Sequence, residues 1–115
     1  MATITLTPET LNVSLSRYER FFGILPNLEI LLAHVRGATH DDGILRDLGM
    51  RAPGLAWPRR ALIGTFRKWR FKDFVVWRNE PQLVVIQLAN ERWDRLVIGV
   101  DDAESVARHI NAVTA

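Results

Sequence analysis

The chain has 115 residues, of which 48% are hydrophobic, and this is enough to build the core of one domain. It contains no cysteine, which excludes disulfides, zinc–thiolate sites, iron–sulfur clusters and thiol nucleophiles. The formal net charge of +2 hides an uneven distribution. Residues 59–78 hold seven basic side chains and one acidic one, whereas residues 79–115 hold three and six. The positive charge is therefore concentrated in one short stretch.

The N-terminal segment alternates in polarity, without the basic start and continuous apolar stretch of a secretory signal. Purely apolar runs such as Leu83 to Ile86 are far shorter than the roughly 20 residues that a membrane-spanning helix needs. We therefore expect a soluble, cytoplasmic protein with a single domain over residues 1–115.

Alternation of Leu11, Val13 and Leu15 with polar residues predicts a first strand that ends near Leu15. Ser16 and Glu19 then have the spacing of a capping box, which predicts a short helix before Pro26.

Residues 28–32 and 34–39 favour two further strands or one bent strand, followed by a turn at residues 40–43. Residues 43–60 contain two prolines and a glycine within eight positions, which favours a long irregular connection.

Three strands are predicted at residues 61–69, 72–78 and 83–88, and their short links favour antiparallel hairpins. A turn at residues 90–94 precedes a final strand over residues 95–100, so that seven strands are expected.

The chain is predicted to end in an amphipathic helix. Asp101 or Asp102 can cap it, and Glu104 favours the positive end of the helix dipole. Five apolar side chains recur at helical spacing and predict a buried face: Ala103, Val106, Ala107, Ile110 and Val113.

Seven antiparallel strands followed by one helix is the element order of the pleckstrin-homology (PH) fold. The chain also resembles short bacterial, chiefly actinobacterial, PH-domain-like proteins in Leu15-Ser16-Arg17, Arg51-Ala52-Pro53-Gly54, Gly64-Thr65, Lys72-Asp73-Phe74, Asp94-Arg95-Leu96 and Val100-Asp101-Asp102. The resemblance implies a mainly β fold, a PH-like seven-stranded antiparallel open barrel capped by the C-terminal helix. It implies no catalytic residues, because these bacterial proteins are mostly of unassigned function.

His40, Asp41 and Asp42 are the only residues grouped like a metal or acid–base site, but adjacent residues at a strand end point in different directions, and a solvated turn is the favoured interpretation. Neither His34 nor His109 has a spacing that completes a ligand set. No phosphate loop, nucleophile elbow or zinc-protease motif occurs. We therefore predict a non-enzymatic protein without a cofactor or a metal.

Two kinds of binding residue remain. An apolar pair, Phe21 and Phe22, together with Trp57 in a proline-flanked segment, favours a protein partner or self-association. This interaction-domain reading is the leading prediction. The alternative is a binder of anionic surfaces, membrane lipid or nucleic acid, that uses the basic stretch 59–72. Its candidate ligand-binding residues are Arg59, Arg60, Arg67, Lys68, Arg70 and Lys72.

The basic stretch does not form one flat patch in this prediction. Arg67 and Lys68 are adjacent on a strand and therefore leave it on opposite faces. Arg59-Arg60 and Arg70 to Lys72 lie at opposite ends of that strand. A partner of the whole stretch is therefore expected to be extended.

Overall fold

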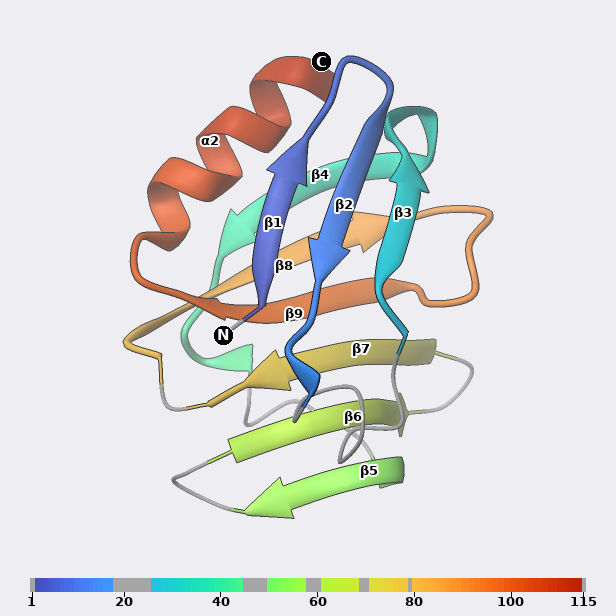
Figure 1. The fold of residues 1–115 in the computed structure, drawn as a ribbon, viewed down its shortest axis with the longest axis vertical. Helices are drawn as coiled ribbons and strands as arrows, with labels where there is room; N and C mark the ends of the chain where they lie inside the picture. The colour runs from blue at the N-terminus through green and yellow to red at the C-terminus, as the bar shows by residue number, and fades with distance from the viewer. Residues whose placement is uncertain are drawn as a thin grey trace.

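The structure is a computed structural model (Figure 1). It describes residues 2–17, 26–44, 50–57, 61–68, 71–78 and 80–114, with the backbone alone at 50–57, 61 and 68. The short helix predicted before Pro26 lies mostly outside these residues.

A three-stranded antiparallel sheet comes first in the chain, in the order β1-β2-β3. Its strands are β1 (Thr3–Leu6), β2 (Thr10–Ser14) and β3 (Leu28–Leu31). The predicted alternation is confirmed in β2, where Leu11 and Val13 are fully buried between exposed or half-buried polar neighbours. A 3-10 turn, η1 (Leu32–His34), then leads into the second sheet.

The second sheet has six strands in the order β4-β8-β9-β7-β6-β5. They are β4 (Val35–His40), β5 (Met50–Trp57), β6 (Ala61–Lys68), β7 (Phe71–Trp77), β8 (Gln82–Leu88) and β9 (Arg95–Val100). All neighbours are antiparallel except β7 and β9, which run parallel. The molecule is thus mainly β.

The prediction of seven strands is wrong, because the described residues form nine. These strands make two sheets, and no closed barrel is found among them. The segment 43–60 is not wholly a connection, because it contains β5. Pro53 is tolerated there since β5 is the last strand of its sheet and its register shifts between Arg51 and Gly54. The other added strand, β1, has the alternating sequence Thr-Ile-Thr-Leu.

The second predicted hairpin is also wrong. The β6–β7 hairpin is confirmed, but β7 and β8 do not pair, because β9 lies between them. The link of residues 78–81 can extend over about 13 Å, which exceeds the two strand spacings of about 4.8 Å each. A short link therefore fixes the relative direction of two strands without making them neighbours.

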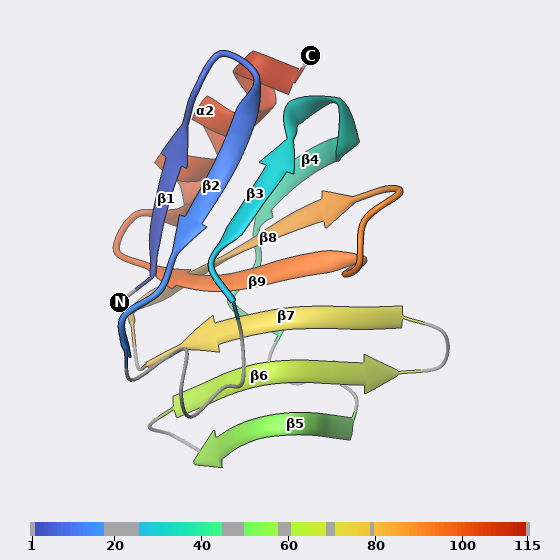
Figure 2. The ribbon, with the colours of Figure 1, turned by 45° about the vertical axis from the view of Figure 1, so that its right-hand side comes forward.

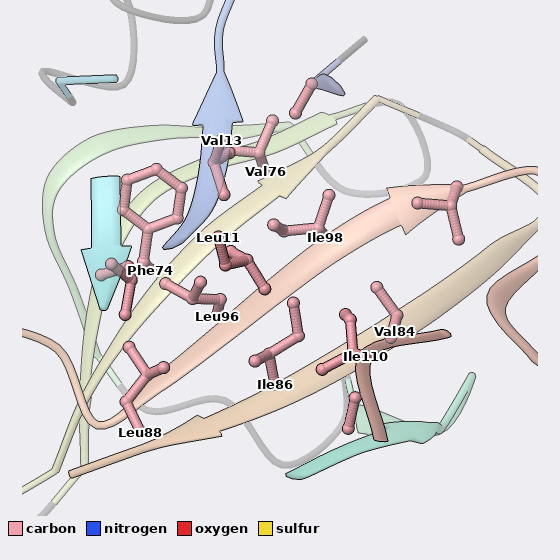
Figure 3. Close-up of a cluster of buried hydrophobic side chains, with 14 of the residues drawn as sticks. Leu11, Val13, Phe74, Val76, Val84, Ile86, Leu88, Leu96, Ile98 and Ile110 are labelled. Carbon is pink, nitrogen blue, oxygen red and sulfur yellow. The ribbon is translucent and has the colours of Figure 1, made fainter. Parts of the chain in front are cut away.

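The main core lies between the six-stranded sheet on one side and the three-stranded sheet and C-terminal helix on the other (Figures 1 and 2). Figure 3 shows side chains from both sheets and the helix meeting there: Leu11, Val13, Phe74, Val76, Val84, Ile86, Leu88, Leu96, Ile98 and Ile110. A second core on the far face of the six-stranded sheet contains Ile44, Phe66, Val75, Leu83, Val85 and Val97.

The predicted helix is confirmed as α2 (Ala103–Thr114), and the Asp102 carboxylate caps it by accepting the Ser105 N–H at 3.1 Å. Ala103, Ala107 and Ile110 are buried, as expected. Val113 is 50% exposed, because it lies on the margin of the apolar stripe in the last turn.

One helix side chain also closes a sheet edge. The Asn111 amide donates to the Ala38 carbonyl and accepts the Ala38 N–H, both at 2.9 Å. Ala38 lies in β4, the edge strand next to α2, so the amide makes the pair of bonds that a further strand would make.

We expect Ile110→Ala to lower the free energy of unfolding by about 2–4 kcal/mol, because it leaves a cavity in the main core. Val113→Ala, a truncation on the same helix at an exposed position, should cost within about 0.5 kcal/mol. Urea unfolding of both variants measures the difference. Equal losses would contradict the described docking of α2.

Candidate functional site

Two of the predicted ligand-binding residues are described with their side chains, Arg67 in β6 and Lys72 in β7. Of Lys68, only the backbone at the end of β6 is described. The other three predicted cations lie outside the described residues: Arg59, Arg60 and Arg70.

The side chains of the predicted partner residues are not among those described. Phe21 and Phe22 lie outside the described residues, and of Trp57 only the backbone at the end of β5 is described.

The β6–β7 hairpin brings Arg67 and Lys72 together. They are direct cross-strand partners, so their side chains leave the hairpin on the same face. Arg67 is exposed and Lys72 half-buried. Sequence reasoning placed neighbours along one strand on opposite faces but did not pair these two residues, because pairing depends on the register.

Phe71 is the functional candidate that sequence reasoning missed. It pairs with Lys68 in the last rung of the ladder, and its side chain is 58% exposed. It lies on the face opposite to Arg67 and Lys72, because it is adjacent to Lys72 on β7. The sequence signal was present, since Phe71 stands between Arg70 and Lys72, but Phe71 itself was interpreted only as part of the link between two strands.

Two other described aromatic residues of this region, Phe66 and Phe74, are structural. Phe66 and Phe74 are buried in the second core and the main core respectively. Phe74 makes an edge-to-face contact with Trp93, with ring centroids 5.1 Å apart, and the Trp93 indole N–H points to the Thr65 hydroxyl at 3.3 Å. These rings are therefore not available as a stacking platform.

The carboxylates near the hairpin are already occupied. Asp73 is 1% exposed and receives two hydrogen bonds from the Arg95 guanidinium, at 2.9 and 2.6 Å. Asp94 accepts the backbone N–H of Lys72 at 2.7 Å. Within the described part of the chain, neither Arg67 nor Lys72 has an ion-pair partner.

Basic and acidic side chains gather at opposite ends of the six-stranded sheet. β7 and β9 begin at the end of the sheet where β6 and β8 finish, and β4 begins there too. Five described cations are at or beside these strand ends: Arg36, Arg67, Lys72, Arg92 and Arg95. Six carboxylates follow the strands that finish at the other end: Asp41, Asp42, Glu80, Asp101, Asp102 and Glu104. Asp73, Glu91 and Asp94 also lie at the first end, and Arg78 lies at the second. The described residues therefore carry a net positive charge at the first, basic end and a net negative charge at the second, acidic end.

The His40–Asp42 group belongs to the acidic end and forms a turn. The Asp42 carboxylate accepts the Leu83 N–H at 2.9 Å and lies 2.8 Å from His40 Nε2. Asp41 accepts the Gly43 N–H at 3.1 Å. Hydrogen bonding by Leu83, followed by the hydrogen bond from His40, lowers the pKa of Asp42 below its ordinary 3.8. These side chains hold the turn against β8.

Other candidate sites in the described residues are weaker. No group of three or more His, Asp or Glu side chains there could hold a metal ion. A surface hollow of about 300 Å³ follows α2, but its lining comes from one helix and none of it is buried: Ser105, Arg108, His109 and Ala112. No described helix is long and apolar enough to cross a membrane.

Comparison with known proteins finds no match for the chain among family models, curated proteins or solved structures.

We expect the stability of the protein to fall as the pH drops through the lowered pKa of Asp42. A carboxylate with a depressed folded-state pKa stabilises the fold above 3.8, and this contribution disappears when the folded form is protonated. Asp42→Asn keeps a side-chain oxygen but removes the charge, so its stability should depend less on pH in this range. Urea unfolding from neutral pH to below 3.8 measures this, with Asp101→Asn as the control. A D42N slope identical to that of the parent would contradict the assignment.

Proposed function

We propose that this protein is a non-enzymatic binding domain that docks the exposed end of its β6–β7 hairpin on an anionic surface. The cationic site consists of Arg67 and Lys72, with Lys68 and Arg70 beside them in sequence. The proposed partner is larger than a single small anion, because Arg59 and Arg60 precede β6 in sequence whereas Arg70 and Lys72 follow it.

The observation that carries the proposal is the pairing of Arg67 with Lys72. Like charges directly opposite each other in an antiparallel ladder destabilise it. No described carboxylate forms an ion pair with either side chain, since Asp73 pairs with Arg95 and Asp94 accepts the backbone N–H of Lys72. An arrangement that costs stability is expected where function requires it, and a bound anion would remove the repulsion.

A protein partner or self-association through Phe21, Phe22 and Trp57 remains a prediction. The described side chains do not test it, because Phe21 and Phe22 lie outside them and only the backbone of Trp57 is described, whereas the pairing of Arg67 with Lys72 supports the anionic surface. The PH-like resemblance also stays a prediction, and the proposed function rests on the hairpin alone.

Arg67→Gln combined with Lys72→Gln should weaken binding to immobilised heparin, used as a probe of anionic surfaces. Removal of two contacts should reduce the slope of log affinity against log salt by about two. The same variant should unfold at an equal or higher temperature than the parent, because the cross-strand repulsion is gone.

Arg67→Gln alone should be compared with Arg108→Gln, which removes the same charge from the exposed side of α2. Arg108→Gln should leave heparin binding nearly unchanged. Equal effects of these two single variants would show a response to net charge and would reject the hairpin as the site.

A further inference from the structure

Phe71 stands out among the exposed apolar side chains. Three large hydrophobic residues in the described part of the chain are at least half exposed: Leu31, Phe71 and Val113. Phe71 is the most exposed of them at 58%, and it stands in the basic stretch, adjacent to Lys72 and opposite Lys68. Exposed aromatic area costs free energy in water, and a nearby apolar phase would recover it.

The position of Phe71 in the hairpin limits the kind of apolar surroundings that could take up its ring. Phe71 opens β7 and pairs with the last residue of β6, so it stands at the outer end of a ladder and not in a groove. A protruding end can enter a soft interface, but it cannot enclose a base. Nucleic-acid readers stack successive bases on several exposed rings, whereas Phe71 is the only exposed ring among the described side chains of β6 and β7.

The positions of the charged side chains favour an end-on contact of the hairpin with a lipid interface. Phe71 leaves one face of the hairpin and the Arg67–Lys72 pair leaves the other. If the hairpin approaches end-on, an apolar ring and two cations reach the same plane, which is the combination that binds anionic lipid interfaces. The six carboxylates at the far end of the sheet would orient the molecule with this end forward. In Figure 1 the facing ends of β6 and β7 lie at the right-hand side, well away from α2.

We propose that the anionic surface is a lipid bilayer, and that Phe71 inserts into its headgroup region while Arg67 and Lys72 contact the lipid phosphates. This inference rests on the proposed function and adds one claim to it, the transfer of an aromatic ring out of water. Charge brings the hairpin to the membrane, and the ring resists its release when salt screens that charge.

The first experiment locates the ring. The chain has no cysteine, so Phe71→Cys provides a single site for an environment-sensitive fluorophore, and Val113→Cys provides a matched exposed control on α2. We expect a blue shift at position 71 with vesicles of phosphatidylcholine and phosphatidylglycerol. No shift is expected with phosphatidylcholine alone, with heparin, or at position 113. Unshifted emission at position 71 on vesicles that bind the protein would overturn the insertion.

The second experiment separates the ring from the charge. Phe71→Ala should reduce partitioning into the anionic vesicles by roughly tenfold, since part of a large apolar side chain no longer leaves water. Its retention on heparin should not change. Val113→Ala should change neither quantity.

The outcomes distinguish the two proposals. Vesicle binding that depends on Arg67 and Lys72 but not on Phe71 would overturn the insertion and leave the anionic-surface function standing. Binding to heparin or to single-stranded DNA without binding to anionic vesicles would overturn the lipid assignment and favour a nucleic acid. Binding to none of these probes at low salt would overturn both proposals.

Discussion

The fold depends on the burial of β9 on both faces. Leu96 and Ile98 point into the main core, whereas Val97 between them points into the second core, and all three are fully buried. A strand that is apolar on both faces cannot stand at a sheet edge without exposing one of them. The run Leu-Val-Ile therefore requires a central position, which it obtains by lying between β7 and β8.

This central position also determines what surrounds the hairpin. Because β9 runs parallel to β7, both strands begin at the same end of the sheet, and Asp73 of β7 is the register partner of Arg95 of β9. The buried Asp73 carboxylate thus receives its guanidinium from the neighbouring strand. The same geometry places Asp94 against the backbone of Lys72. Had β9 run antiparallel to β7, Arg95 would lie at the opposite end of the sheet, and Asp73 would need another cation.

Sequence reasoning succeeded where the information is local. The strands at residues 61–69, 72–78 and 95–100 and the Asp102 cap follow from periodicity and capping chemistry within a few residues. It failed where the structure depends on contacts between segments that are distant in sequence. No residue close to β7 in the sequence indicates that β9 lies beside it. The prolines and the glycine of residues 51–58 are compatible both with a loop and with an irregular edge strand. Charge density identified the basic stretch, but the exposure of Phe71 depends on where the ladder of β6 and β7 ends.

The two edges of the six-stranded sheet narrow the ways in which this domain can bind. At β4, the Asn111 amide occupies the Ala38 backbone groups that another strand would need. At β5, Pro53 lacks an N–H and sits where the register shifts, so continuous pairing with a further strand is interrupted. Both devices oppose recognition by strand addition, whether by a second copy or by an extended peptide. A partner that contacts side chains at a strand end meets neither obstacle, and the β6–β7 hairpin offers such an end, with an exposed ring and two cations that no described carboxylate pairs.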